Sequence, residues 1–237
     1  MRGKGFTFKQ FHIDHSRCAM KVGTDGTLLG AWATLPTAGR ILDIGTGTGL
    51  IAIMAAQRTA EARITAIDID ADCISQAREN IKASPWSDRV EVLHSPLQEF
   101  TPNDTFDAII SNPPYFIDSQ LPPDAARSTA RHTETLPFDE LTQGVLRLLA
   151  PEGHFALILP PPEMTRFLSA SRGRLYVRRR CEVWSTPTSG VRRVMAELVT
   201  TPPAQPPITE TVIIEDSGRH GYSAEYRALT RDFYLKF

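Results

Sequence analysis

The amino-acid sequence predicts an α/β fold in which a mostly parallel, doubly wound sheet ends in an antiparallel hairpin. Short aliphatic and β-branched runs alternate with helical stretches from Arg40 to Leu159, which is typical of a parallel sheet. A glycine-rich loop at residues 45–49 follows the first of these runs and leads directly into a helix. Two strand-like segments, Leu175–Trp184 and Val191–Thr200, are joined by a short Ser/Thr/Pro/Gly loop, which indicates the hairpin.

The part of the chain before residue 160 divides into alternating strands and helices. Its apolar runs predict five strands, at Arg40–Ile44, Ile64–Ile67, Val90–Leu93, Phe106–Ile110 and His154–Leu159. Apolar residues spaced three and four apart predict three helices, at Leu50–Gln57, Asp72–Ala83 and Asp139–Leu149. Pro137 stands just before the last of these helices and supports that boundary.

The sequence beyond residue 160 is expected to complete the sheet. Around the hairpin it predicts a basic helix at Glu163–Ser171, a short strand at Val212–Glu215 and a terminal helix at Ala224–Phe233. Four prolines within Thr201–Pro207 indicate a stiff connector, since the ~30 residues that follow are too few for a separate core. We therefore expect a single domain over residues 1–237, made of an N-terminal extension at 1–39, a core at 40–160 and a sheet-completing part at 161–237.

Composition places the chain among ordinary globular proteins and excludes several function classes. Its 237 residues are 41% hydrophobic and 22% charged, with no apolar run of transmembrane length and no signal-peptide core near the N-terminus. The three cysteines lack the paired spacing of a zinc site or a disulfide framework. We therefore expect no metal, no membrane association and a location in the reducing cytoplasm.

Charge is unevenly distributed along the chain, although the net charge is only -1. Residues 166–193 contain eight arginines and one acid, Glu182. Such a stretch forms either a solvated basic face or a surface for nucleic acid, and composition leaves both readings open. The arginines are Arg166, Arg172, Arg174, Arg178, Arg179, Arg180, Arg192 and Arg193.

The glycine-rich loop reads D-I-G-T-G-T-G from Asp43 to Gly49. It is not a dinucleotide fingerprint, because Leu50 and Ala52 stand where the third glycine of G-x-G-x-x-G would be required. It resembles the D-x-G-x-G-x-G loop of class I S-adenosylmethionine-dependent methyltransferases, which implies a Rossmann-like sheet and S-adenosylmethionine as cofactor. The resemblance assigns the amino-acid part of the cofactor to Asp43, Gly45, Thr46 and Gly47.

Two further strand ends are expected to hold the nucleoside part of the cofactor. Asp68 ends the second strand, where a carboxylate would reach the ribose hydroxyls, and Ile69 would pack on the adenine. Many class I methyltransferases carry an acid after the third strand, but this chain has Ser95-Pro96-Leu97 there. We expect Pro96 and Leu97 to border the adenine, with a serine or backbone contact in place of the acid.

The tetrad Asn112-Pro113-Pro114-Tyr115 follows the fourth strand and is the expected catalytic site. An exocyclic amine on an aromatic ring is a poor nucleophile because its lone pair is delocalised. Asn112, which also borders the cofactor, can accept one of its N–H groups and the Pro113 carbonyl the other, which localises the lone pair. The two prolines fix the backbone, and Tyr115 offers a stacking face for the base. A rigid proline turn without chemistry is the alternative reading.

The segment after the tetrad is expected to act as a substrate lid. It runs from Phe116 to Thr135, which is long for a loop without secondary structure. It contains His132, a residue type common in loops, to which we assign no role. The mechanism needs no general base, because alignment of nitrogen, methyl group and sulfur supplies most of the acceleration.

Sequence outside the tetrad narrows the target amine. N-P-P-Y tetrads act on adenine N6 and cytosine N4 in nucleic acids and on the glutamine amide of release factors. Enzymes that modify DNA usually carry a sizeable recognition domain, which the residues after 160 leave no room for. Release-factor enzymes usually carry a helical domain before the first strand, and only 39 residues precede Arg40 here. Both features favour an RNA substrate.

Four segments together resemble the bacterial tRNA1(Val) (adenine-37-N6)-methyltransferases. They are residues 5–11, 18–26, 111–115 and 222–235. The resemblance covers nearly the whole chain and implies N6-methyladenosine beside the valine anticodon as product. It also implies that residues 21–25, which include Lys21 and Thr24, approach the cofactor as part of an N-terminal extension that lies over the cofactor site. A protein glutamine N5-methyltransferase and a non-catalytic RNA-binding module are the alternatives.

An RNA substrate suggests a role for part of the basic stretch. We expect phosphate contacts from Arg174, Arg178, Arg180 and Arg192, without sequence readout. Strand alternation predicts that Arg178 and Arg180 share one face. The expected partner is tRNA, and no obligatory protein partner is inferred.

Overall fold

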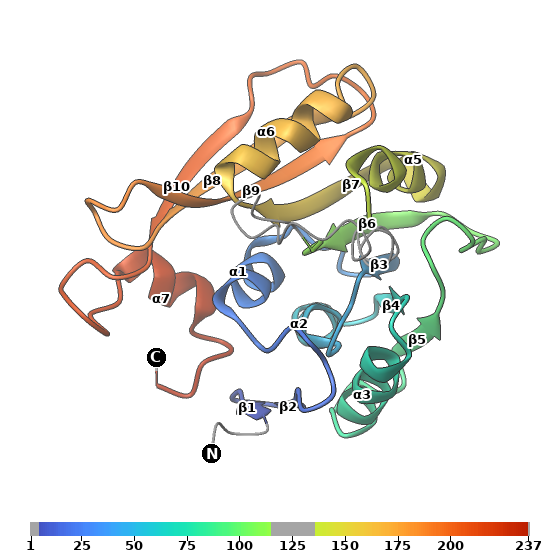
Figure 1. Cartoon of the computed structure of the whole chain (residues 1–237), viewed down its shortest axis with the longest axis horizontal. Helices are drawn as coiled ribbons and strands as arrows, with labels where there is room; N and C mark the ends of the chain where they lie inside the picture. Colours follow the sequence, from blue (N-terminus) through green and yellow to red (C-terminus); the bar gives the residue numbers. More distant parts are fainter. Residues whose placement is uncertain (1–4, 115–135, 237) are drawn as a thin grey trace, which may run out of the picture.

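A single large mixed sheet forms the centre of the computed structural model (Figure 1). The structure describes residues 5–114 and 136–236. Within these residues the sheet has eight strands in the order β10-β8-β9-β7-β6-β3-β4-β5. The strands are β3 (Arg40–Ile44), β4 (Arg63–Asp68), β5 (Val90–His94), β6 (Phe106–Ser111), β7 (Leu149–Leu159), β8 (Tyr176–Trp184), β9 (Val191–Val199) and β10 (Ile208–Ile213).

One strand of the sheet, β9 of the C-terminal hairpin, runs opposite to the other seven. Strands β5, β4, β3, β6 and β7 pair in parallel, whereas β9 runs antiparallel to both β7 and β8. The edge strand β10 then pairs in parallel with β8. The predicted fold class, a mostly parallel doubly wound sheet completed by a hairpin, is confirmed.

Helices cover both faces of the sheet (Figure 1) and bury a separate core on each. One core contains side chains from α1, α2, α3 and α7, and the other contains side chains from α5 and α6. Among the described residues, no helix is both long and apolar enough to cross a membrane. The helices are α1 (Thr24–Trp32), α2 (Leu50–Arg58), α3 (Ala71–Lys82), α5 (Phe138–Leu148), α6 (Pro161–Ala170) and α7 (Ala224–Thr230).

Strand β7 differs most from its predicted bounds. It begins at Leu149 instead of His154, and its pairing with β6 shifts register between Phe106 and Ala108. Gly153 permits this irregular pairing, because a Cβ there would lie 2.9 Å from the carbonyl oxygen of Phe106. Pro151 and Gly153 lie in this early part of the strand. Because both residue types are unusual within strands, the sequence pattern does not predict it. The last strand and the terminal helix also shift, to Ile208–Ile213 and Ala224–Thr230.

Helix α1 was not predicted, because its pattern lacks a polar face. All residues from Gly26 to Trp32 are buried, so no three- and four-residue periodicity is visible. Its two glycines allow close packing on α2: a Cβ at Gly26 would lie 3.2 Å from Leu50, and one at Gly30 would lie 2.8 Å from Met54. This contact fixes the start of α1 beside the start of α2.

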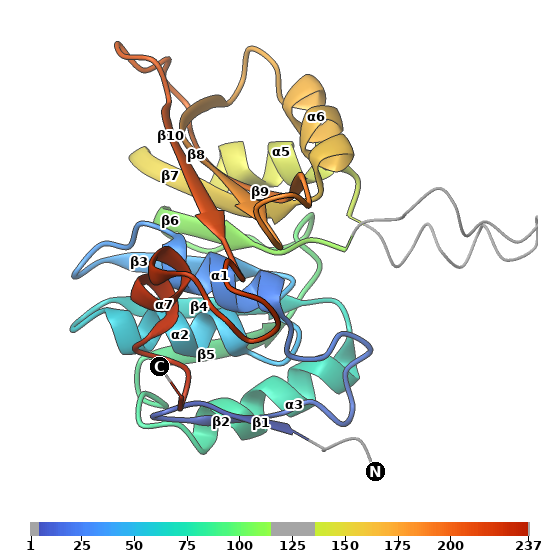
Figure 2. The same ribbon diagram turned by 90° about the vertical axis from the view of Figure 1, so that its left-hand side faces the viewer.

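The N-terminal hairpin of β1 (Gly5–Thr7) and β2 (His12–Asp14) lies along α3, as Figure 2 shows. Asn80 of α3 exchanges two hydrogen bonds with the backbone of Asp14, at 2.8 and 3.0 Å. The Lys9 amide donates to the carbonyl of Phe233 in the C-terminal tail at 2.7 Å. This hairpin, the first part of the N-terminal extension at residues 1–39, is therefore held against α3 and the C-terminal tail.

Candidate functional site

The expected site residues follow strands that are neighbours in the sheet. Strands β6, β3, β4 and β5 are adjacent and parallel, so the residues after their carboxyl ends meet at one edge. These residues are the loop at 43–49, Asp68 and Ile69, residues 95–97, and Asn112 with the prolines that follow. The fold thus brings together segments spread over about 70 residues of sequence.

The glycine-rich loop turns through backbone conformations that only glycine adopts easily. Gly45, Gly47 and Gly49 have φ values of 70°, 55° and 82°. A Cβ at Gly45 or Gly47 would meet nothing within 4 Å, so these two residues present bare backbone to open space. A Cβ at Gly49 would contact Ala77 and Ile81 of α3 at 3.4 Å. The first two glycines can therefore face a ligand, whereas the third serves packing.

Asp43 is buried at the end of β3 and is only partly satisfied. One carboxylate oxygen accepts a hydrogen bond from the Thr46 hydroxyl at 2.6 Å, and the other, Oδ1, has no partner among the described residues. Burial raises the pKa of Asp43 to about 7. A buried carboxylate oxygen without a donor is costly, and a ligand ammonium group would remove that cost. The site therefore fits the amino-acid end of the expected cofactor.

Asp68 fixes the loop from the neighbouring strand. Its Oδ2 accepts the Gly47 amide at 2.8 Å, and its Oδ1 accepts the Asp70 amide at 3.0 Å. Ile69 beside it is 48% exposed, which is unusual for isoleucine and leaves an apolar platform at the edge. A carboxylate next to an exposed apolar side chain suits a ribose joined to an aromatic base.

The segment after β5 offers a ligand little besides backbone. The Ser95 amide donates to the Asp68 carbonyl at 3.0 Å, and its hydroxyl donates to the Pro96 carbonyl at 3.1 Å. Leu97 is buried in the core beside Gly144, and its carbonyl accepts from Arg147 at 2.7 Å. The Ser95 hydroxyl is thus already used within the chain, so any contact in place of the missing acid falls to the backbone and to Pro96.

Asn112 carries the clearest unsatisfied group at this edge. Its side-chain oxygen Oδ1 is buried and has no hydrogen-bond partner among the described residues. The preceding residue, Ser111, is fully buried and donates its hydroxyl to the Ile44 carbonyl at 2.9 Å, which fastens the end of β6 to the end of β3 just before Gly45. The site therefore holds an acceptor oxygen ready for an N–H donor, beside the glycine loop.

Two neighbours of Asn112 differ in burial, and the rest of the expected site is not described. Pro113 is buried and Pro114 is exposed. Tyr115, the expected lid at residues 116–135 and His132 lie outside the described residues.

Lys21 and Thr24 flank the start of α1 with exposed side chains. Asp25, in the first turn, forms an ion pair with Arg193 of β9, with 2.6 Å between its Oδ2 and Nε. Sequence reasoning missed this pair, because 168 residues separate its members. The pair ties the first turn of α1 to β9.

Most of the basic stretch is neutralised within the chain. Among the described residues, six of its eight arginines form ion pairs with acids: Arg166 with Glu163, Arg174 with Asp139, Arg178 and Arg179 with Glu197, Arg180 with Glu182, and Arg193 with Asp25. Glu197 is fully buried, so separating it from its arginines would leave a charge in the core.

The expectation that Arg178 and Arg180 share a face is wrong. The pairing of β8 with β9 shifts register between Val177 and Arg179, so Arg178 is an extra residue in the strand. Arg178 and Arg179 consequently reach the same acid, Glu197, while Arg180 pairs with Glu182 two residues along its own strand. A bulge of this kind shifts the alternation of faces, and sequence pattern does not reveal it.

Comparisons with known proteins agree on one kind of enzyme. Residues 18–136 match the family model described as "Methyltransferase small domain". A tRNA1(Val) (adenine(37)-N6)-methyltransferase of Phocaeicola vulgatus is 50% identical over 97% of this chain and 97% of its own length. A protein of the same description from Photobacterium profundum is 47% identical over 98% of this chain and 99% of its own.

Solved structures support the fold. A protein of Agrobacterium tumefaciens described as a predicted O-methyltransferase superimposes with a TM-score of 0.69. The match covers 88% of this chain and 96% of that chain, at 18% sequence identity. At this identity the likeness concerns the arrangement of the sheet and helices alone.

Proposed function

Because the chain belongs to the family of tRNA1(Val) (adenine(37)-N6)-methyltransferases, we propose that it methylates N6 of adenine-37 in tRNA1(Val). It is a methyltransferase, and S-adenosylmethionine is its methyl donor. The observation that carries the proposed chemistry is the buried Oδ1 of Asn112 at the end of β6, which has no hydrogen-bond partner within residues 5–114 and 136–236. An exocyclic amine bound in the site would donate an N–H to this oxygen and satisfy it.

The cofactor side of the proposal rests on the neighbouring strand ends. The bare backbone of Gly45 and Gly47, with Thr46 between them, would hold the amino-acid part, and Asp43 would attract its ammonium group. Asp68 would accept from the ribose hydroxyls, while Ile69 would cover one face of the adenine. Pro96 and the Leu97 backbone would border its edge. When bound, the cofactor supplies an electrophilic methyl group on a sulfonium.

The substrate side of the proposal rests on two acceptors. Asn112 Oδ1 would accept one N–H of the adenine amino group, and the Pro113 carbonyl would accept the other. The two hydrogen bonds would keep the lone pair on the adenine amino nitrogen instead of letting it delocalise into the ring. That lone pair would then point toward the methyl group. Tyr115 would stack on the base. Most of the acceleration would then come from alignment of nitrogen, methyl group and sulfur, so the proposed chemistry requires no dedicated base.

The decisive experiment is methyl transfer to total tRNA from cells that lack this modification, followed by nucleoside analysis. We expect N6-methyladenosine, confined to the valine tRNA. Methylation of a release factor with no reaction on RNA would instead identify a glutamine methyltransferase. Failure to turn over S-adenosylmethionine with either substrate would identify a non-catalytic RNA-binding module.

Since its substrate is a tRNA, we propose that the enzyme acts in the cytoplasm and needs no protein partner for catalysis. Activity of the purified chain on purified tRNA tests the second point. A requirement for a cell extract would contradict it.

Cofactor binding should depend on pH through Asp43. Its pKa is raised to about 7, so the group is largely neutral in the apo-protein below that pH. If only the carboxylate attracts the cofactor ammonium, affinity for S-adenosylhomocysteine should rise about 25-fold between pH 5.5 and pH 7.5. The free energy of unfolding of the apo-protein should fall as pH rises from about 4 to about 7, because in that range the folded state binds a proton that the unfolded state releases.

Calorimetry across this pH range provides the measurement, and Asp43→Asn is the matched control. The amide keeps the shape of the side chain but cannot titrate, so its affinity should be weaker and nearly independent of pH. A wild-type profile as flat as that of Asp43→Asn would rule out the proposed contact.

A further inference from the structure

Some basic residues of this part of the chain are paired with acids, and others are exposed without an ion pair and so remain available to a ligand. Six of the eight arginines between residues 166 and 193 are already paired with acids. Within the described parts of the chain, the exposed side chains of Arg172, Arg192 and Lys21 form no ion pair or hydrogen bond. An anion can bind such a cation without breaking an existing pair, so those of the three that lie at the catalytic edge are the candidates for contact with RNA.

The topology places Arg192 at the catalytic edge of the sheet. Ser111, just before Asn112, pairs with Leu157 of β7, and Leu159 of β7 pairs with Val194 of β9. The start of β9 therefore stands at the same edge as Asn112, about two strand spacings or roughly 10 Å along the sheet. Arg192 lies at this start, two residues before Val194.

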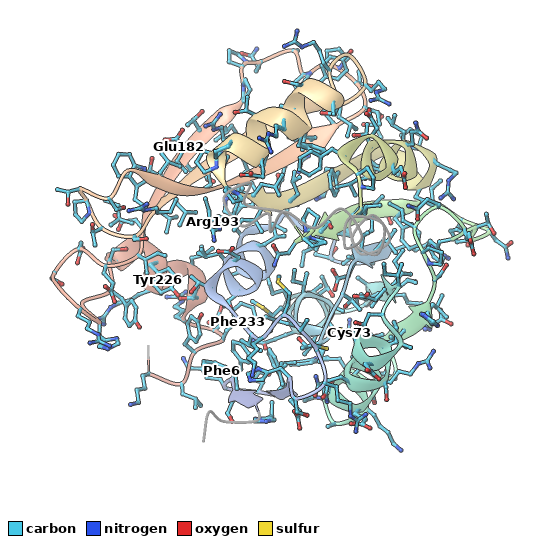
Figure 3. All side chains as sticks on the ribbon, viewed as in Figure 1. Phe6, Cys73, Glu182, Arg193, Tyr226 and Phe233 are labelled. Atoms are coloured by element: carbon cyan, nitrogen blue, oxygen red, sulfur yellow. The ribbon has the colours of Figure 1, made fainter. Side chains whose placement is uncertain are left out.

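The ion pair between Arg193 and Asp25 joins this strand to the segment that carries Lys21. Figure 3 shows Arg193 between β9 and α1. Its Nε lies 2.6 Å from Asp25 Oδ2, and its Nη1 donates to the Arg192 carbonyl at 2.8 Å. The side chains of both partners are about one quarter to one third exposed, so solvent screens the pair only in part. Lys21 stands four residues before Asp25 in the sequence and is exposed.

We propose that Lys21 and Arg192 bind RNA phosphates on two sides of the target nucleotide, and that the Arg193–Asp25 pair sets their separation. This inference rests on the proposed function and assigns Lys21 to the RNA instead of the cofactor. The two cations belong to segments far apart in sequence, and the paired residues between them carry no net charge. An extended phosphate backbone offers charges on both sides of a base that has swung out of its stack.

Arg172 provides a matched control at the opposite end of the hairpin. It precedes Tyr176, which pairs with Val199 at the far end of β9. That end of β9 is roughly 25 Å from Arg192 along the strand. Both arginines are exposed and unpaired, so the same substitution removes the same charge at either place.

The first test measures tRNA affinity over a salt series in the presence of S-adenosylhomocysteine. Arg192→Met and Lys21→Met should each weaken binding and reduce the slope of log affinity against log salt by about 0.7–0.9, as expected for one lost phosphate contact. Arg172→Met should keep the wild-type slope. Equal slopes for Arg192→Met, Arg172→Met and wild type would overturn the proposal, as would loss of S-adenosylhomocysteine affinity in Lys21→Met at an unchanged slope.

The second test separates positioning from charge. Asp25→Asn removes a negative charge and Arg193→Met a positive one, so simple electrostatics predicts opposite effects on tRNA affinity. If the pair positions Lys21 and Arg192, both variants should raise KM for tRNA several-fold with kcat within about twofold, and the double variant should be no worse than either. Tighter tRNA binding by Asp25→Asn would overturn the positioning role.

The wild-type reaction distinguishes failure of the proposed function from failure of the proposed phosphate contacts. If wild-type protein makes no N6-methyladenosine in tRNA, the proposed function fails. If it does, but the salt slopes do not change as described, only the phosphate contacts of Lys21 and Arg192 are refuted.

Discussion

Replacing Asn112 with alanine is expected to lower the rate of methyl transfer at least 100-fold. The side-chain oxygen is the buried acceptor at the catalytic edge, and alanine leaves the target amine with its lone pair delocalised. A 100-fold loss corresponds to about 2.7 kcal/mol of transition-state stabilisation. Affinity for S-adenosylhomocysteine should stay within about twofold, because the oxygen acts on the substrate amine.

Single-turnover rates with saturating tRNA and cofactor measure this effect without a contribution from binding. Asn112→Asp is the informative partner variant, since it keeps an acceptor oxygen in the same place and should retain more activity than Asn112→Ala. If Asn112→Ala keeps more than about a tenth of the wild-type rate, worth less than ~1.4 kcal/mol, the acceptor mechanism is wrong.

The core of the fold was predictable because its signals are local. Strand β3 and the loop after it consist of an apolar run followed by closely spaced glycines, and both have their predicted bounds. The positive φ values of Gly45 and Gly47 explain why the loop requires this residue type. Asn112 could be placed for a similar reason, since it directly follows a strand of strong β propensity.

The remaining features depend on contacts between distant segments. Helix α1 is buried almost all round, so it lacks the polar face that identifies a helix in sequence. The pairing of Arg193 with Asp25 arises only when β9 and α1 meet in the folded chain. The bulge at Arg178 likewise depends on how β8 pairs with β9 and is not visible in the sequence of β8 alone. A cluster of arginines in sequence therefore predicts positive charge but not which charges stay available.

Replacing Glu197 with alanine is expected to destabilise the protein by about 3–5 kcal/mol, the usual cost of breaking a buried ion pair by removing one partner. Glu197 is fully buried and accepts the Thr34 amide at 2.6 Å, Arg178 at 3.2 Å and Arg179 at 3.5 Å. Alanine would remove the acceptor of the Thr34 amide and of Arg178 between β9 and the end of α1, whereas Arg179 would keep its ion pair with Glu210.

The stability that Glu197 provides should disappear in acid. Although burial favours its neutral form, hydrogen bonds from Thr34 and the positive charges of His154 and Arg178 hold the pKa of Glu197 below its usual value. A lowered carboxyl pKa stabilises the folded state above the pKa of the unfolded chain, about 4.3, and this contribution is lost as pH falls through the folded pKa. Urea unfolding of wild type and Glu197→Ala should therefore differ most near pH 7 and converge below about pH 4.

Glu182→Ala is the control, because its pair with Arg180 is partly exposed and should contribute less than ~1 kcal/mol. Equal stability losses in the two variants at pH 7 would show that the buried network around Glu197 does not hold α1 to the sheet.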